Sequence, residues 1–469
     1  MAPRTSNALE KGRSMSDIAL VVRGHVVLPR LTLPGGYVAV GEDGAVVSVG
    51  QGAAPAAAEV ADYGDCLVLP GAIDGQVHSR SQAGQEDFVW STRAAAAGGV
   101  TTIVDMPYDD GNLIATGDKL RTKAREAGAQ ARVDFALYGT LPPDSSGAEV
   151  ANLVAAGAAA FKFSTFGTHP TRFPRIPPQT LFRFFAAIAP TGLSAGVHNE
   201  SDEFVRAAIA DVEAAGLTDF RAHGLSRPPL SEALATAEIY EIGAATGCRA
   251  HVVHCSIGRG YELCAAYRQQ GFDATIEACI HYLVLSEEDD VARLNGFAKI
   301  NPPIRARAER EALWRHLAAG NVTIVSTDHV SWSRNRKDNP DILKSASGAP
   351  GLEALYPLLL GELERRGLSF GFAARLLAEN PARHFRLHEK GAISVGRHAD
   401  IAVMRRAPYV YEASASGHNF VDWSPYDGLT LSWRPEAAFV RGKRVFEAGQ
   451  VLAEPGSGRF TAPATREAA

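Results

Sequence analysis

The stretch GAIDGQVH (71–78) is a short apolar run that ends in a histidine, and seven runs of the same kind follow it along the chain. They are VTTIVDM (100–106), VDFALYGT (133–140), AAAFKFST (158–165), LSAGVH (193–198), CRAHVVHC (248–255), FDATIEAC (272–279) and VTIVSTD (322–328). The segments between them, such as LSEALATAEIYEIGAATG (230–247), carry apolar residues at helical spacing, and several close with Gly. Eight strands alternating with helices predict an α/β fold, a (β/α)8 TIM barrel.

The two ends of the chain share a different texture. Residues 17–70 read as β-branched runs broken by Gly and Pro, with a hairpin turn at Glu42-Asp43-Gly44. Similar runs return in GAISVGRHADIAVM (391–404) and AAFVRGKRVFEAGQVL (437–452). We therefore expect a small β-sandwich domain built from both chain ends. The predicted boundaries are a disordered tail at 1–15, the N-terminal half of the sandwich at 16–69, the barrel at 70–387, the C-terminal half of the sandwich at 388–460 and a second tail at 461–469.

Bulk composition excludes several classes of protein. The formal net charge of the 469 residues is −5, with acidic and basic residues interspersed, so nucleic acid is not an expected partner. The five cysteines are scattered without a Cys-x-x-Cys pair, which favours a reducing compartment and predicts a cytoplasmic protein. No apolar window is long enough to span a bilayer and the first residues lack a signal-peptide core, so no membrane association is expected.

Reactive side chains stand near the ends of five of the eight runs: His78, Lys162, His198, His254 and Asp328. The carboxyl ends of barrel strands surround one catalytic mouth, so these five side chains are predicted to converge there.

Each of these residue types suits a metal centre. Lys162 lies in an apolar strand, where a neutral amine can react with CO₂ to give a carbamate that bridges two divalent metals; pairing with an aspartate is the alternative. His198 and His254 are candidate zinc ligands, and otherwise satisfied core histidines. Asp328 is a candidate ligand and general base, and otherwise a cap on the following segment. The predicted mechanism is attack of metal-activated hydroxide on a carbonyl, with Asp328 accepting and returning the proton.

Ten blocks resemble the cyclic-amide branch of the amidohydrolase superfamily, the hydantoinase, dihydropyrimidinase, allantoinase and dihydroorotase group. They are LPGAIDGQVHSR (69–80), AAAAGGVTTIVDMP (94–107), FKFS (161–164), GVHNE (196–200), VVHCS (252–256), IEACIHYL (276–283), KINPPIR (299–305), STDH (326–329), ENPARHF (379–385) and GRHADIAV (396–403). The resemblance implies a barrel with a sandwich formed by both ends, a two-metal site bridged by carbamylated Lys162, and a homo-oligomer, dimer or tetramer. His78, Lys162, His198, His254 and Asp328 match the metal positions of the family, and Asp328 matches its catalytic base.

One ligand departs from the family pattern, because Gln76 stands where the first histidine of its His-x-His motif is expected. A glutamine oxygen can bind metal, although zinc prefers nitrogen. Three outcomes are open. Gln76 binds weakly through oxygen, the first metal has fewer protein ligands, or only a metal between His198 and His254 remains.

The resemblance implies a small cyclic amide or ureide as the substrate, and further departures from the family pattern bear on which one. Arg80 matches an arginine that holds the substrate carboxylate in dihydroorotases, although a surface or packing role is an equal alternative. Its companion asparagine is replaced by Tyr108, and the tyrosine of dihydropyrimidinases and D-hydantoinases is replaced by Gly167. Asn301 matches a position that holds the cyclic imide edge, or else serves a turn. The IEACIHYL block favours an allantoinase-like or hydantoinase-like activity.

Three hypotheses therefore stand. The leading one is a metal-dependent cyclic amidohydrolase with one or two divalent ions, zinc being favoured by the histidines, and dihydropyrimidinase or dihydroorotase activity is its variant. The second is a catalytically silent oligomeric scaffold with an impaired metal site. A deaminase on the same barrel is the third, and the lysine at the end of the fourth run argues against it.

Overall fold

The computed structural model describes residues 18–82, 84, 86–169 and 173–464. The tail predicted for residues 1–15 and the last five residues of the tail predicted at 461–469 lie outside the described residues. The described portion of that second segment lies along the barrel, where the amide of Thr461 donates to the carbonyl of Phe135 over 2.7 Å.

Eight parallel strands form the barrel, and each arises from one of the eight predicted runs. They are β5 (Ala72–Val77), β6 (Val100–Asp105), β9 (Asp134–Gly139), β10 (Ala160–Ser164), β11 (Ser194–His198), β12 (Arg249–Val252), β13 (Ala274–Cys279) and β14 (Ile324–Ser326). The ring closes between its first and last strands, because the amide of His78 donates to the carbonyl of His329 over 2.9 Å. The (β/α)8 prediction is confirmed.

The barrel strands are apolar because both of their faces are covered. Successive residues alternate between an inner cluster, which includes Val104 and Tyr138, and an outer cluster beneath the helices, which includes Ile103 and Leu137. A strand buried on both faces needs apolar side chains at nearly every position.

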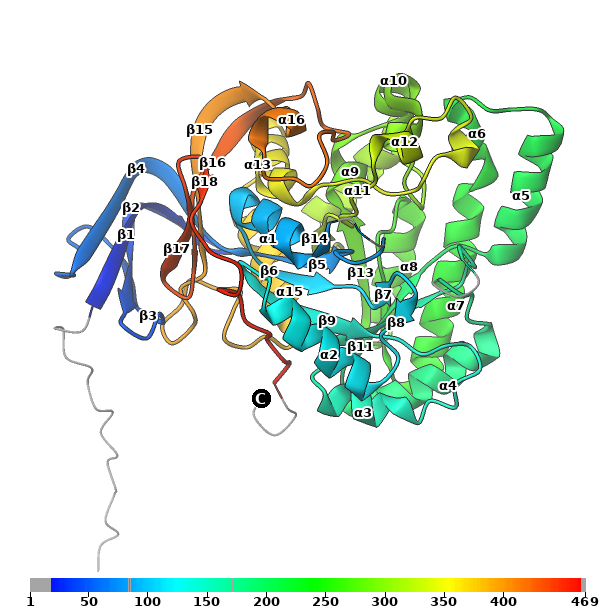
Figure 1. Cartoon of the computed structure of the whole chain (residues 1–469), viewed down its shortest axis with the longest axis horizontal. Coiled ribbons are helices and arrows are strands. Elements are labelled where there is room, and N and C mark those ends of the chain that lie inside the picture. Colours follow the sequence, from blue (N-terminus) through cyan, green and yellow to red (C-terminus); the bar gives the residue numbers. More distant parts are fainter. Residues whose placement is uncertain (1–17, 83, 85, 170–172, 465–469) are drawn as a thin grey trace, which may run out of the picture.

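Helices surround the barrel (Figure 1). The longer ones are α1 (Asp87–Gly98), α2 (Gly117–Gly128), α3 (Glu149–Ala155), α4 (Pro178–Ile188), α5 (Asp202–Ala214), α6 (Phe220–Ser226), α7 (Pro229–Thr246), α8 (Gly258–Gln269), α11 (Arg307–Ala318) and α13 (Leu355–Arg365). Short pieces are α9 (Ile280–Val284), α10 (Ala292–Leu294), α12 (Arg334–Lys337), α14 (Gly371–Ala374), α15 (Asn380–His384) and α16 (Ala413–Ser416), with a small hairpin of β7 (Tyr108–Asp109) and β8 (Asn112–Leu113). Among the described helices, none has the length and apolar character needed to cross a membrane.

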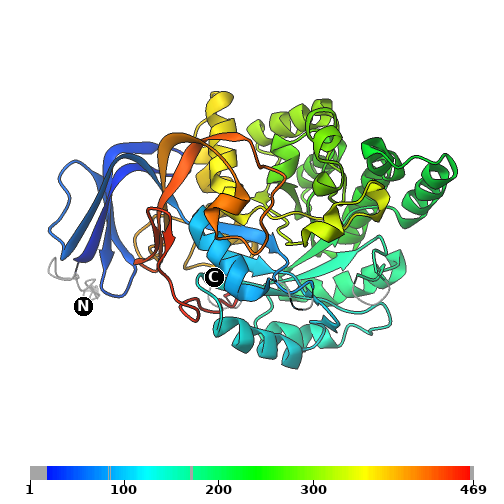
Figure 2. The ribbon, with the colours of Figure 1, turned by 45° about the horizontal axis from the view of Figure 1, so that its top comes forward.

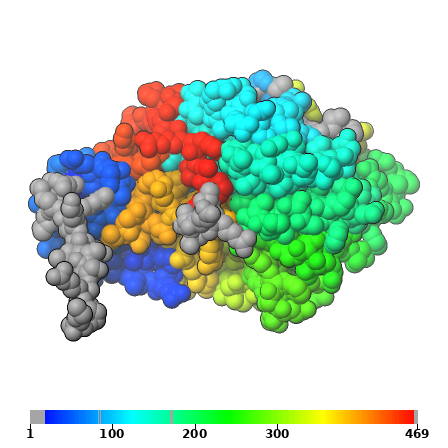
Figure 3. Space-filling model, turned by 90° about the horizontal axis from the view of Figure 1, so that it is seen from below, coloured from blue at the N-terminus to red at the C-terminus, as the bar shows by residue number. Residues whose placement is uncertain are grey.

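The two chain ends meet in one eight-stranded sheet of order β18-β17-β16-β15-β4-β1-β2-β3. Its strands are β1 (Ile18–Val27), β2 (Thr32–Gly41), β3 (Val46–Gln51), β4 (Glu59–Pro70), β15 (Ile401–Val410), β16 (Thr430–Val440), β17 (Lys443–Glu447) and β18 (Gln450–Val451). In Figure 2 the N-terminal strands lie at the end of the molecule farthest from α5. Seen from below, atoms of the C-terminal part of the chain (orange and red) lie between those of the N-terminal part (blue) and those of the middle of the chain (green) (Figure 3).

Strand β15 joins this sheet to the barrel through its two faces. Ile401 and Val403 belong to the core of the end sheet, whereas Ala402 and Met404 belong to the main core, as the two-residue period of a strand requires. The contact is close at Gly99, which ends α1 in the left-handed conformation, because a Cβ there would lie 2.7 Å from the Met404 side chain. The end sheet therefore contributes to the outer cover of the barrel.

Candidate active site

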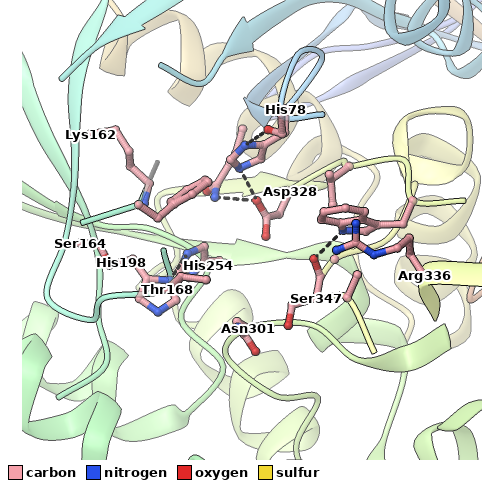
Figure 4. Close-up of a pocket in the computed structure, with 17 residues that line it drawn as sticks. His78, Lys162, Ser164, Thr168, His198, His254, Asn301, Asp328, Arg336 and Ser347 are labelled. Carbon is pink, nitrogen blue, oxygen red and sulfur yellow. Dashed lines mark hydrogen bonds and ion pairs between the residues drawn. The ribbon is translucent and has the colours of Figure 1, made fainter. Parts of the chain in front are cut away.

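A cavity of about 250 Å³ opens at the carboxyl ends of the barrel strands. It is lined by Gln76, His78, Ser81, Lys162, Ser164, Thr168, Phe173, His198, His254, Asn301, Asp328, Val330, Trp332, Arg336, Ala346, Ser347 and Gly348. Figure 4 shows Lys162, His198 and His254 on one side of it, Arg336 and Ser347 on the other, and Asp328 between them. The structure thus brings together all six side chains predicted as metal ligands.

The first group of side chains centres on Asp328, two residues beyond β14. Its Oδ1 accepts a hydrogen bond from Nε2 of Gln76 over 2.7 Å and lies 3.3 Å from Nε2 of His78. The other ring nitrogen of His78, Nδ1, lies 3.0 Å from Oγ of Ser81. The side-chain oxygen of Gln76 is buried without a hydrogen-bond partner among the described residues. Asp328 is therefore held by two neighbours that both approach the same carboxylate oxygen.

The second group is the pair His198 and His254, which lie on adjacent strand ends. Nδ1 of His198 lies 3.0 Å from Nε2 of His254, and Nε2 of His198 lies 2.7 Å from Oε2 of Glu200. Burial alone raises the pKa of Glu200, but the charge of Arg227 and the bond from His198 lower it to about 2, so Glu200 is ionised and only accepts. His198 must then carry its proton on Nε2, which leaves the lone pair of Nδ1 directed at His254.

Lys162 lies within β10, and its ammonium group has few polar partners among the described residues. Among the described residues, Nζ has one hydrogen bond, of 3.2 Å to the carbonyl of Phe163. Burial lowers its pKa to about 8, although Asp328 and Glu277 oppose the shift. Strand β10 is itself held by Tyr108, whose hydroxyl donates to the carbonyl of Lys162 over 3.1 Å. A buried lysine with a lowered pKa and one weak partner is suited to react as the neutral amine.

Two of the site residues have strained backbones. The φ angles of His254 and Asp328 are 38° and 51°, in the left-handed region that residues with a Cβ rarely adopt. Such conformations cost about 1–3 kcal/mol each and gather at functional sites, where the surrounding structure holds them. The strain here aims both side chains into the cavity.

The fit of a metal ion can be tested on these donors. The described residues hold no group of three or more His, Cys, Asp or Glu side chains that could bind one. They do hold two pairs, His198 with His254 and His78 with Asp328, at 3.0 and 3.3 Å. Ligands on a tetrahedral zinc with bonds of 2.0–2.1 Å lie about 3.3 Å apart, so both pairs fit. Gln76 fits less well, because its amide already donates to Asp328.

The two predicted substrate-binding residues lie in different environments. Asn301 lines the cavity, and its side-chain oxygen is buried without a partner among the described residues. Arg80 is not among the lining residues, because its guanidinium forms ion pairs of 2.7 Å with Asp87 and with Glu126. Of the two alternatives for Arg80, the structure supports the packing role.

One wall of the cavity was not anticipated from the sequence. It is formed by Trp332, Arg336 and the segment 346–348, which lie between β14 and α13, with Arg336 on the short helix α12. Glu200 and Arg227, which hold His198, also had no predicted role. Glu200 lies within the GVHNE block, two residues beyond a candidate ligand, and that spacing is the one signal that could have singled it out.

The chain is similar to known proteins along nearly its whole length. The model of the amidohydrolase family matches residues 67–445. An allantoinase from Rubrobacter xylanophilus is 36% identical over 96% of this chain and 98% of its own length. An L-hydantoinase from Paenarthrobacter aurescens is 31% identical over 88% of this chain and 91% of its own length.

Solved structures give the same result for the fold. The L-hydantoinase (dihydropyrimidinase) from Arthrobacter aurescens superposes with a TM-score of 0.91 at 29% identity, covering 95% of this chain and all of that one. A D-hydantoinase superposes with a TM-score of 0.87 at 28% identity, covering 96% and 99%.

Proposed function

Because this chain belongs to the amidohydrolase family, we propose that it hydrolyses a C–N bond in a small cyclic amide or ureide, in the manner of an allantoinase or a hydantoinase. The observation that carries the proposal is the convergence of Lys162, His198, His254 and Asp328 on one cavity at the carboxyl ends of the strands. Relatives named allantoinase and L-hydantoinase along nearly the whole chain support the same reaction class.

A divalent metal, zinc being favoured by the imidazoles, would be held by His198 and His254, with Asp328, His78 and a carbamate on Lys162 as further ligands and Gln76 as a weak one. When bound, it would polarise the scissile carbonyl and lower the pKa of water. Whether one ion or two are present depends on position 76.

The residues of the chain supply the remaining steps. Asp328, with Oδ1 held by Gln76 and His78, accepts the proton of the attacking water and returns it to the leaving nitrogen. Glu200 keeps His198 in the tautomer that presents Nδ1 to the cavity. The unpartnered oxygen of Asn301 accepts a hydrogen bond from a ring N–H of the substrate.

Two alternatives differ in support. A silent scaffold gains support from the bond between Gln76 and Asp328, since it ties up a catalytic group. Dihydroorotase activity loses support, because the ion pairs of Arg80 remove the expected carboxylate clamp.

Self-association belongs to the proposal, because exposed apolar side chains gather on neighbouring helices α4 to α7: Phe182, Phe204, Leu225, Leu230 and Leu234. Light scattering would report a dimer or tetramer.

The test is ring opening by protein purified without chelators and loaded with zinc or manganese in bicarbonate. Allantoin, 5-substituted hydantoins, dihydropyrimidines and dihydroorotate are compared by the loss of the cyclic amide. We expect turnover of allantoin or a hydantoin, reduced about 10²–10⁴-fold in Asp328→Asn, and little change in the exposed control Asp338→Asn. No metal uptake and no turnover of any ring would leave the silent scaffold.

A further inference from the structure

Arg336 lies on the cavity wall opposite Lys162 and has no anionic partner among the described residues. Its guanidinium carbon lies 4.8 Å from the ring centre of Trp332, and the side chain is exposed at the cavity mouth. Within the described ranges, no carboxylate lies at ion-pair distance from Arg336 and its side chain forms no hydrogen bond. Figure 4 shows Arg336 across the cavity from Lys162, with Asp328 between them.

Two other arginines differ from Arg336 in this respect. Arg334, two residues earlier on α12, pairs with Asp422 at 2.8 Å, and buried Arg227 pairs with Glu200. Among the described lining residues, Arg336 is the one arginine. A cation at the mouth of a cavity, without a counter-charge in the described part of the chain, is suited to bind an anion from solution.

The wall beneath Arg336 is held by hydrogen bonds. Nε1 of Trp332 donates to the carbonyl of Ser347 over 2.8 Å. The next residue, Lys337, is fully buried, and its Nζ donates to the carbonyls of Ala346 and Gly348 over 2.8 and 2.7 Å. Arg336 therefore packs against an indole ring that is held in place and lies beside a hydrogen-bonded loop. This packing reduces the entropic cost of ordering its guanidinium when a ligand binds.

Resting on the proposed function, we propose that Arg336 selects cyclic amides whose ring substituent carries a carboxylate. With the scissile amide beside Asp328, a substituent that extends across the cavity reaches the opposite wall. The planar guanidinium can donate two parallel N–H bonds to a carboxylate there, which a neutral substituent cannot match. Arg336 is thus a specificity residue. The carboxylate that it binds is on the ring substituent of the substrate, away from the amide bond that is cleaved.

The test compares 5-(carboxymethyl)hydantoin with its neutral counterpart 5-(carbamoylmethyl)hydantoin, which have nearly the same shape. We expect wild-type kcat/KM to favour the carboxylate by about tenfold, a modest ratio because the exposed arginine is screened by solvent. Arg336→Met should abolish the preference, Arg336→Lys should retain some of it, and added salt should reduce it in the wild type. Arg334→Met, on the same short helix but paired with Asp422, is the matched control and should keep the wild-type ratio.

Failure of this inference is separable from failure of the proposed function. Turnover of both hydantoins with equal kcat/KM, or a preference that survives in Arg336→Met, would overturn the role of Arg336 and leave the hydrolase standing. If neither ring is opened, calorimetric titration of the two hydantoins into wild type and Arg336→Met decides the point. Tighter binding of the carboxylate that is lost in the variant supports the assignment, and equal dissociation constants overturn it.

Discussion

The side-chain amide of Gln76 donates a hydrogen bond of 2.7 Å to Oδ1 of Asp328, the oxygen that also faces His78. Gln76 lines the cavity, and the oxygen of the same amide is buried without a hydrogen-bond partner among the described residues. Position 76 therefore does two things that the histidine of the family would not do together. Its side-chain N–H donates a hydrogen bond to Asp328, and its side-chain oxygen is a weak potential metal ligand.

Replacing this glutamine by histidine should strengthen metal binding. For Gln76→His we expect a zinc dissociation constant lower by roughly tenfold, because an imidazole nitrogen is a better zinc ligand than an amide oxygen. Competition against a chromogenic chelator measures the constant, and elemental analysis gives the number of ions per chain. Gln51→His, at an exposed position of the end sheet, controls for a histidine added elsewhere. An affinity equal to that of the wild type would show that position 76 is not a ligand.

Carbamate formation on Lys162 should begin at a lower pH than on an ordinary lysine. Burial lowers its pKa from 10.5 to about 8, so the amine is protonated and unreactive below pH 8 and neutral above it. With ¹³C-bicarbonate, the carbamate signal in the NMR spectrum should rise between about pH 7 and 9, one unit on either side of that pKa. Lys162→Met should lack the signal, whereas Lys344→Met, at an exposed position, should retain it. A signal that appears only near the ordinary lysine pKa of 10.5 would contradict the lowered value.

Glu200 should matter to both metal affinity and stability. In Glu200→Gln the tautomer of His198 is no longer held by a charged acceptor, and we expect metal affinity to fall about 10–100-fold. The variant also leaves the buried charge of Arg227 uncompensated, at about 3 kcal/mol of unfolding free energy. Metal titration and thermal unfolding measure the two effects. Glu203→Gln, whose side chain is 68% exposed, should change neither.

Arg80 should contribute little to catalysis. Both of its ion-pair partners are partly exposed, so Arg80→Met is expected to cost about 0.5–1 kcal/mol of stability and to change kcat/KM less than about twofold. The measurement is made with dihydroorotate and with the most active substrate of the panel. A loss of kcat/KM for dihydroorotate alone would instead support a role of Arg80 in binding the substrate carboxylate.

The strands of the barrel were predictable because burial on both faces requires an apolar run in each of them. The convergence of His78, Lys162, His198, His254 and Asp328 on one cavity could be predicted from their places at or near strand ends. The ion pairing of Arg80 could not be foreseen, because its partner Glu126 lies in α2, 46 residues later, and only folding brings the two together. The wall around Trp332 and Arg336 lies in loops and the four-residue helix α12, which are too short for periodicity to indicate which side chain faces the cavity.

Strand β4 is covered on one edge by β15, with Val68 opposite Val403 and Leu69 opposite Ala402. That partner follows about 330 residues later in the chain. At synthesis rates of about 5–20 residues per second, a ribosome needs roughly 15–65 s to cover that distance. During this interval an apolar edge stands ready to pair with any other emerging chain. This protein should therefore aggregate when many chains are synthesised at once. Lowering the rate of translation initiation, more than the rate of elongation, should reduce that aggregation.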